Sequence, residues 1–450
     1  TLSLFFLSLT INIFPMGVPV SPGPAAPTGV KERISILDSL RGFAILGILL
    51  ININGFSLGA WDPSIYNETG LDYLSFYLVQ LIPHGAQRGL FSLLFGAGIV
   101  LFLQNLESKL DGTKPADYFF RRQLWLIAFS TFDLYVLLWE GDILLDYAIM
   151  GMLMFPFRNL PAKKLLIGAG VCMCMMLARG NLDLHHDKQV IAKGEYAAAL
   201  DTSVTKLTGK QRDELEKMEE FKAYNQPEKK KERADKWREK MRSNYGEVRD
   251  ARTGHYIDTL TRYMYFEAWD ILCMMFLGMA LFRSGVLLGH SSMKTYALMF
   301  IIGTSLGLLL SYLRIQEIEK YQYNDFELAK HKLFDFYELT RVLRTVGFVG
   351  FLLLLHKSGL FNWLFKLLQP VGQMAFTNYL MQSLMLGLIF NGYGLGLFGK
   401  LPRHETFLVV GGVWLLQIIY SNIWLRYYRF GPFEWLWRSL TYWKVQPFMK

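Results

Sequence analysis

The sequence is low in charge and very low in cysteine. Only 19% of its 450 residues are Asp, Glu, Lys or Arg, and three are cysteines. Soluble domains carry charge on about a quarter of their residues, so this composition argues against an ordinary soluble protein. Because Cys172, Cys174 and Cys273 all lie in apolar segments, neither a disulfide framework nor a zinc site is predicted, and no other metal centre is expected. The sequence shows no internal repeat, which argues mildly against transporter folds built from duplicated halves.

Hydrophobic side chains are abundant instead. They make up 52% of the chain, aromatic residues make up 15%, and the mean hydropathy is +0.22. These values predict an all-α, polytopic helical protein whose main partner is the lipid bilayer. The net charge of +9 resides mostly in short connections between apolar segments, a distribution typical of a membrane protein and not of one that binds nucleic acid.

Apolar windows predict about ten membrane spans. They lie at residues 41–60, 86–105, 119–139, 143–158, 162–178, 260–282, 294–313, 337–356, 371–391 and 405–425. Alternate connections are basic, whereas the short connections WDPSIYNETGLD and WEGD are acidic. Since basic connections stay in the cytoplasm, both termini are predicted to be cytoplasmic. Residues 71–83 predict an additional amphipathic or re-entrant helix.

The spans fall into two halves around a charged insert. We expect an N-terminal tail and linker at 1–32, a first membrane half at 33–179, the insert at 180–257, and a second half at 258–450 that ends in an interfacial helix. The tail is interpreted as loose or interfacial sequence, with a cleaved signal as the alternative. Interleaved Glu and Lys or Arg in the insert predict solvated helices on the outer side. These helices are expected to form either a solvated cap without chemistry or a lid or partner-binding surface.

The first span carries polar residues at unusual depth. In LDSLRGFAILGILLININGF, residues 37–56, the side chains of Asp38, Arg41 and Asn52 share one helical face. Polar groups inside a bilayer are costly unless they meet partners or water. This face is therefore predicted to line a polar cavity.

Two further positions are candidates for acid–base chemistry. His84 and Arg88 lie one turn apart at the outer mouth of the second span. A histidine there is suited to act as a general base, and the alternative is an interfacial histidine beside an arginine that reaches lipid headgroups. Asp142 begins the fourth span, where a carboxylate either caps the helix or takes part in function.

Charges in the outer half of the later spans form another group. Glu267 and Asp270 lie in the sixth span, and Arg341 and Arg344 lie in the eighth. Pairing between carboxylates and arginines of different helices is the simplest expectation, and a substrate path is the alternative.

A polar stripe crosses the ninth span in GQMAFTNYLMQS, where Asn378 and Gln382 are one turn apart and Tyr379 lies beside them. Hydrogen bonds between helices explain this stripe, and contact with an acyl donor is the alternative.

Five segments in this order resemble the YeiB-like family of bacterial membrane proteins, known as domain of unknown function 418. They are LDSLRGFAILGILLININ, RGLFSLLFGAG, LLWEGDILLDYAIMG, PVGQMAFTNYLMQS and FGPFEWLWRSLTYWK. The resemblance extends from about residue 33 to 447, interrupted by the insert. It implies a multi-pass protein of the bacterial cytoplasmic (inner) membrane and supplies no activity.

The first segment is also similar, more distantly, to two groups of transmembrane acyltransferases: bacterial O-acyltransferases that modify surface sugars, and heparan-α-glucosaminide N-acetyltransferase. Both begin with a helix of the LDxLRG kind and use cytoplasmic acyl-coenzyme A to acylate a sugar across the membrane. The histidine of the first group falls on Asn52 here, and that of the second falls on Pro63. The resemblance thus implies acyl transfer in which His84 or a carboxylate takes over the role of base.

Our working hypothesis is an acyltransferase that moves an acyl group from cytoplasmic acyl-CoA, for example acetyl-CoA, to an outer sugar or lipid acceptor. The residues assigned to chemistry are His84, Asp142 and Asn52. Those assigned to the donor are Asp38, Arg41, Arg121, Arg122, Asn378 and Tyr379. Those assigned to the acceptor are Arg88, Glu267, Asp270 and Arg344. The alternatives are a transporter or channel for a small polar or amphipathic solute, and a membrane partner protein without catalysis. A homodimer is a candidate assembly.

Overall fold

The structure is a computed structural model. It describes residues 34–200 and 206–450, apart from the side chains of residues 261–263, 265 and 266. Every named element in that part of the chain is helical, as the sequence predicts. The predicted tail at residues 1–32 lies outside the described residues.

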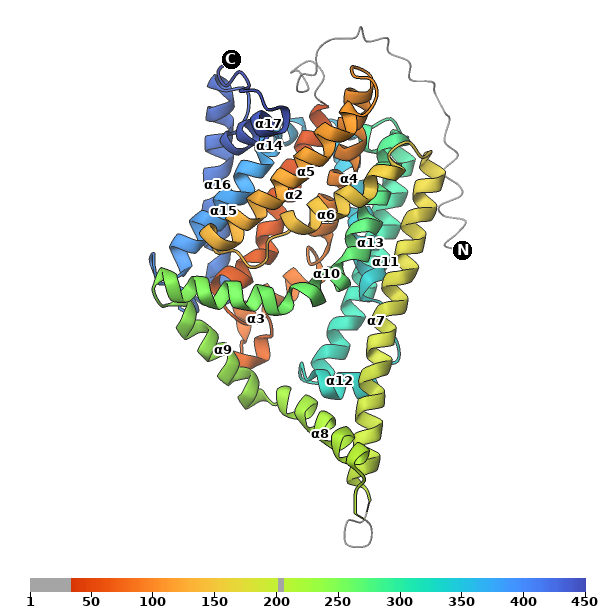
Figure 1. Ribbon diagram of the computed structural model, residues 1–450, viewed down its shortest axis with the longest axis vertical. Helices are drawn as coiled ribbons and strands as arrows, with labels where there is room; N and C mark the ends of the chain where they lie inside the picture. The colour runs from red at the N-terminus through yellow and green to blue at the C-terminus, as the bar shows by residue number, and fades with distance from the viewer. Residues whose placement is uncertain (1–33, 201–205) are drawn as a thin grey trace.

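Ten helices correspond to the apolar windows. They are α2 (Ser35–Ser57), α4 (Ala86–Glu107), α5 (Lys114–Phe132), α6 (Leu144–Met154), α7 (Ala162–Ala198), α10 (Tyr245–Arg283), α11 (Met293–Lys320), α13 (Tyr337–Ser358), α15 (Ala375–Phe390) and α16 (Arg403–Tyr427). Shorter or more polar helices lie between and after them: η2 (Pro63–Tyr66), α3 (Gly70–Leu81), η3 (Asp133–Leu137), η4 (Phe155–Phe157), α8 (Gly209–Tyr224), α9 (Pro227–Met241), η5 (Val286–Leu288), α12 (Asp325–His331), α14 (Asn362–Gln373) and α17 (Pro432–Tyr442). In Figure 1, α17 and the C-terminus lie at one end of the bundle, and α8 and α9 lie at the other.

Six helical stretches among the described residues are long and apolar enough to cross a membrane. They are Ser35–Ser57, Gly70–Glu107, Ala162–Ala198, Met293–Lys320, Tyr337–Ser358 and Arg403–Tyr427. Helices α6 and α15 belong to apolar segments that are shorter than this. The composition of these stretches is that of a polytopic helical membrane protein.

The charged insert continues directly from two of the bundle helices. The predicted boundaries at residues 180 and 257 fall inside α7 and α10. Helix α7 has 37 residues, so at 1.5 Å per residue it is about 55 Å long, well beyond the roughly 30 Å of a bilayer core. Between these two helices, α8 and α9 cross below the bundle (Figure 1). We call α8 and α9 the strap.

Glycines bring α2 and α14 into contact at the end of the bundle near α17. A Cβ atom on Gly372 would lie 1.7 Å from the carbonyl oxygen of Asp38, and one on Gly42 would lie 2.3 Å from that of Leu368. Only glycine permits so close an approach of two helices. The contact places the start of α2, with Asp38 and Arg41, beside the junction of α14 and α15.

The chain between α5 and α6 is irregular. The single π-helical turn η3 ends at Leu138, whose φ of 60° is left-handed, and the chain then crosses to α6. Asp133 and Asp142, on either side of this crossing, are both buried. Irregular backbone of this kind is tolerated in a membrane protein where other helices cover it.

Candidate functional site

A cavity of about 230 Å³ opens among α2, α4, α5, α6, α15 and α17. We call it the inner cavity. Four of the residues that the sequence assigned to an acyl donor line it: Asp38, Arg41, Arg122 and Tyr379. They come from helices far apart in the chain, so the fold brings these predicted residues together.

The inner cavity carries an excess of positive charge. Nη1 of Arg41 lies 2.9 Å from Oδ1 of Asp38, which balances that arginine. The guanidinium of Arg122 is stacked between aromatic rings, 4.8 Å from the ring centre of Phe102 and 3.9 Å from that of Trp437. No described carboxylate forms an ion pair with Arg122. A guanidinium held in this way keeps its donors available for an anionic ligand.

The one other carboxylate that lines the inner cavity is engaged elsewhere. Glu434 of α17 accepts hydrogen bonds from the backbone amides of Phe376 and Thr377, at 2.7 and 3.0 Å, and from the Thr377 hydroxyl at 2.5 Å. These groups belong to the first turn of α15, where a carboxylate satisfies free amides. Burial nevertheless raises the pKa of Glu434. Glu434 therefore anchors α17 over the cavity and leaves Arg122 without a counter-charge.

Asp142 lies behind the deep wall of the inner cavity. Its carboxylate accepts hydrogen bonds from the Tyr379 hydroxyl at 3.0 Å, from the Leu144 amide at 3.2 Å and from the hydroxyl of Ser130. Its side chain is buried and does not line the cavity. Because the Leu144 amide begins α6, this geometry agrees with the capping alternative, and Tyr379 connects Asp142 to the cavity surface.

A second cavity, of about 310 Å³, lies toward the strap. We call it the outer cavity. Its walls come from the segment just before η2, from α3, α9 and α11, and from the start of α12, and His84 lies in the wall. Aromatic side chains (Trp61, Phe76 and Tyr323) alternate there with charged ones (Asp62, Lys230, Arg314 and Asp325).

His84 has an unusual environment. Its ring lies 6.3 Å from the ring of Trp61 and 5.8 Å from that of Tyr337. Its Nδ1 is buried and has no hydrogen-bond partner among the described residues. Four arginines lie close enough for their charges to act on it: Arg88, Arg314, Arg341 and Arg344.

The expected pairs between carboxylates and arginines form beside His84. Arg88 pairs with Glu267 and, at 3.2 Å, with Asp270. Asp270 also pairs with Arg341, whose Nη1 lies 3.2 Å from Glu338. These contacts join α4, α10 and α13 and confirm the interhelical pairing that the sequence predicts.

Arg344 binds backbone carbonyl oxygens and not the carboxylates of this cluster. It donates to the carbonyl oxygens of Gln80 and Leu81, at 2.9 and 3.2 Å, and thereby holds the end of α3.

A thin wall separates the two cavities. Tyr147 lines the inner cavity, and its hydroxyl lies 2.7 Å from the Ser92 hydroxyl and 3.5 Å from the Arg88 carbonyl oxygen. Phe91, the lining residue of α4 nearest to His84 in sequence, is seven positions from it. His84 precedes α4 and Phe91 lies in its second turn, and the two cavities share no lining residue.

Comparison with known proteins gives the family. The family described as "Protein of unknown function (DUF418)" matches residues 281–444. The "Uncharacterized protein YeiB" of Escherichia coli (strain K12) is 32% identical over 426 residues, which are 91% of this chain and 96% of that protein. The chain belongs to the DUF418 family. The "Uncharacterized protein YxaH" of Bacillus subtilis (strain 168) is 30% identical over 443 residues, which are 94% and 98% of the two chains. No solved structure matches this DUF418 chain.

Eight predicted site residues of this DUF418 protein line neither cavity. They are Asp142, the four residues assigned to the acceptor (Arg88, Glu267, Asp270 and Arg344), and Asn52, Arg121 and Asn378. Asn52 is absent from both walls. Arg121 pairs with Asp117 and stacks on Trp443, with 4.3 Å from its guanidinium carbon to the ring centre. Asn378 donates to the Ser421 hydroxyl at 3.1 Å, which is the hydrogen bonding between helices expected for its stripe. The fold therefore separates Asn52, Arg121 and Asn378 from the walls of the two cavities.

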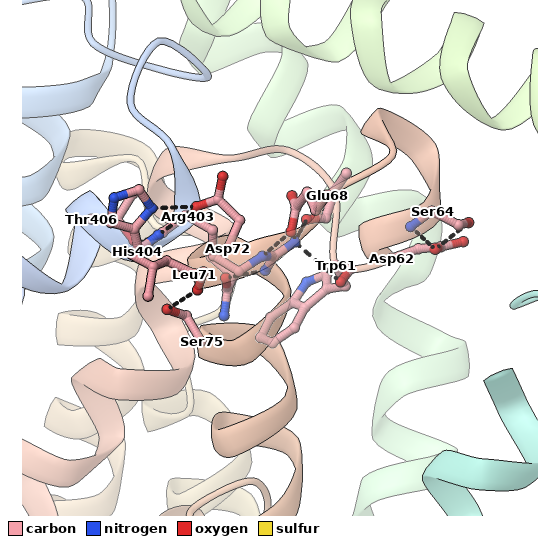
Figure 2. Close-up of polar contacts among 12 residues, drawn as sticks. Trp61, Asp62, Ser64, Glu68, Leu71, Asp72, Ser75, Arg403, His404 and Thr406 are labelled. Atoms are coloured by element: carbon pink, nitrogen blue, oxygen red, sulfur yellow. Dashed lines mark hydrogen bonds and ion pairs between the residues drawn. The ribbon is translucent and has the colours of Figure 1, made fainter.

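Arg403 is a residue that the sequence analysis missed. It begins α16, is only 2% exposed, and binds both carboxylate oxygens of Glu68, at 2.5 and 3.0 Å, and Asn54 Oδ1 at 2.6 Å. Figure 2 shows it reaching the segment that carries Trp61 and Asp62, with His404 hydrogen bonded to Asp72 beside it. Arg403 thus holds part of the outer wall of the DUF418 fold in position.

Proposed function

We propose that the protein is an integral-membrane acyltransferase that takes an acyl group from cytoplasmic acyl-CoA to an acceptor on the outer side. The observation that carries the proposal is the inner cavity, where Arg41 and Arg122 meet beside apolar walls. Arg122 has no carboxylate partner among the described residues, so the cavity favours a ligand that is both anionic and amphipathic.

The proposal includes a membrane arrangement with ten spans. They would be α2, α4, α5, α6, α7, α10, α11, α13, α15 and α16, with both termini in the cytoplasm. The basic segment that contains α17 would then lie at the cytoplasmic face, together with the inner cavity to which α17 contributes Arg438. The strap and the outer cavity would lie on the opposite side.

The residues of the inner cavity fit acyl-CoA by charge and by shape. A guanidinium binds phosphate through two parallel hydrogen bonds, which suits Arg122 and Arg41 to the phosphates of the nucleotide. Phe91, Phe95 and Phe119 offer an apolar wall to the acyl chain. A cavity of about 230 Å³ accommodates the acyl group and part of the thiol arm, which leaves the nucleotide at the cytoplasmic mouth. Bound acyl-CoA would supply an acyl group activated as a thioester.

His84 would serve as the general base. It lines the outer cavity, and its buried Nδ1 has no hydrogen-bond partner among the described residues. The wall between the two cavities would have to open for an acceptor whose hydroxyl or amine donates to His84 to reach the thioester. Arg88, four positions further along the chain, is ion-paired with Glu267 and Asp270, and its carbonyl oxygen accepts a hydrogen bond from Tyr147 of the inner cavity. The side chains of Tyr147 and Phe91 in that wall would exclude water from the acyl group.

Two measurements on purified protein in nanodiscs test the proposal. Coenzyme A binding is measured by calorimetry, and transfer from radiolabelled acetyl-CoA is measured with a panel of sugars and lipids. Binding together with transfer to one acceptor class would support the enzyme. Protein that neither binds nor consumes acyl-CoA would refute it. Solute uptake by proteoliposomes without acyl-CoA consumption would favour the transporter instead.

A further inference from the structure

The outer cavity borders an apolar surface on α3. Leu71, Leu74, Leu78 and Ile82 are 62, 47, 43 and 56% exposed, and their spacing of three or four residues places them on one face. Phe76, on the opposite face of α3, lines the cavity. One side of α3 therefore suits lipid while the other side faces the cavity.

Helix α11 repeats this arrangement. Leu309, Tyr312 and Leu313 are 52, 45 and 53% exposed, and the next residue, Arg314, lines the cavity. A run of exposed apolar side chains that ends in an arginine is typical of the boundary between hydrocarbon and headgroups. The outer cavity thus lies between two helices that each expose an apolar face, an arrangement suited to the level of lipid headgroups.

Arg314 offers its charge to the cavity. Its guanidinium carbon lies 4.6 Å from the ring centre of Tyr337, and its Nε is buried with no hydrogen-bond partner. No ion pair between Arg314 and a carboxylate is found among the described residues. Since a buried donor without a partner is costly, this geometry favours an anionic ligand.

The remaining polar groups of the cavity fit the rest of a headgroup. Lys230 of the strap lies 3.2 Å from Asp62 Oδ2 and donates to the Tyr323 carbonyl oxygen at 2.5 Å, so it and Asp62 offset each other. Asp325, at the exposed rim, can accept hydrogen bonds from hydroxyl groups. His84 lines the same space, and its buried Nδ1 has no hydrogen-bond partner among the described residues.

We propose that the outer cavity binds the phosphate-bearing headgroup of a lipid from the outer leaflet, with Arg314 on the phosphate and the chains against α3 and α11. This inference rests on the proposed function in one respect: a hydroxyl or amine carried by the headgroup beyond its phosphate would be the acceptor. An ester or amide bond to the acyl group would form as the thioester bond breaks, and the proton lost by the acceptor would pass to the departing coenzyme A thiolate. Lipid binding itself needs no acyl-CoA, so it is measured separately from transfer.

The experiment measures binding to detergent-purified full-length protein in the absence of acyl-CoA. The probes are dioctanoyl phosphatidic acid, dioctanoyl phosphatidylcholine, dioctanoylglycerol and inorganic phosphate, followed by native mass spectrometry and by thermal stabilisation. Phosphatidic acid is expected to bind most tightly, and Arg314→Gln is expected to weaken it about tenfold, the effect of one charge-assisted hydrogen bond. Arg314→Lys, which keeps the charge, should lose less.

The matched control is Lys320→Gln, which removes an exposed cation from the same helix at a position outside the cavity. It should leave binding unchanged. Lys230→Gln, which removes the other cation of the cavity, is the second test variant if Arg314→Gln folds poorly, and it should also weaken binding. Equal binding of dioctanoylglycerol, which lacks the phosphate, equal stabilisation by inorganic phosphate, or equal losses in the Lys320 control would each overturn the proposal. If the unmodified protein binds coenzyme A but none of the lipid probes, this inference is refuted and the proposed function is not.

Discussion

Replacing Arg122 by glutamine should weaken coenzyme A binding while leaving the fold intact. Glutamine keeps the polarity and much of the length of the side chain but removes the charge that the structure leaves without a carboxylate partner. A hydrogen bond between a charged donor and a phosphate contributes about 1.5 to 3 kcal/mol. Since 1.4 kcal/mol corresponds to a factor of ten, the dissociation constant should rise by about 10- to 150-fold.

The adjacent residue gives a matched control. Arg121 belongs to the same helix and carries the same charge, but it is paired with Asp117 outside the cavity wall. Arg121→Gln should therefore change the dissociation constant by less than about threefold, because a partly exposed ion pair contributes little. Calorimetry on both variants in nanodiscs makes the comparison.

Stability must be measured alongside binding, because Arg122 also packs between Phe102 and Trp437. Loss of these contacts should cost about 0.5 to 2 kcal/mol, which thermal denaturation without ligand detects. Arg122→Lys, which keeps the charge but not the planar group, should bind with intermediate affinity. If Arg122→Gln binds coenzyme A like the wild type, or if the Arg121 variant loses as much, the assignment of the inner cavity to the donor is wrong.

Three other changes give distinct expectations. His84→Asn should lower acyl transfer by about 10²- to 10⁴-fold with coenzyme A binding unchanged, and a parallel loss of binding would argue for a structural histidine. Arg403→Ala should destabilise the protein by about 3 to 5 kcal/mol because it empties a buried site and leaves the largely buried carboxylate of Glu68, 11% exposed, without its partner. Thermal denaturation measures this, and the double variant with Glu68→Gln should recover part of the loss. Gly372→Ala should cost about 1 to 3 kcal/mol, since its Cβ would collide with the Asp38 carbonyl oxygen, and an unchanged melting temperature would contradict the tight contact between α2 and α14.

The all-α fold and the polar cavity at the start of α2 were predictable from the sequence, because burying polar groups is costly and such groups stand out in an apolar segment. Asp38 and Arg41 interrupt an apolar run, so their presence already indicates a partner or a cavity. Both line the inner cavity together with Arg122, which the sequence placed on the same side of the membrane. Each apolar window likewise coincides with a helix, because hydrophobic length is a local property.

Other features depend on contacts that local sequence does not encode. Arg403 lies at the end of a predicted span, where an arginine ordinarily reaches solvent, so nothing indicated that it would be 2% exposed beneath η2. Asn52 shares a helical face with Arg41 by periodicity. The inner cavity nevertheless does not extend along α2 as far as Asn52. The separation of His84 from the inner cavity arises from how α4 packs against α6, which no single segment determines.

Helix α10 has a mechanical consequence. It continues without a break from the strap into the bundle as one helix of 39 residues. Near its outer end Arg252, fully buried, faces Glu140 at 3.5 Å, and further along Asp270 joins Arg88 and Arg341. Figure 1 shows α10 bending between its part beside the strap and its part inside the bundle. A change in that bend would displace Asp270, so a molecule that contacts the strap end of α10 would loosen or tighten the arginines around His84 without touching them.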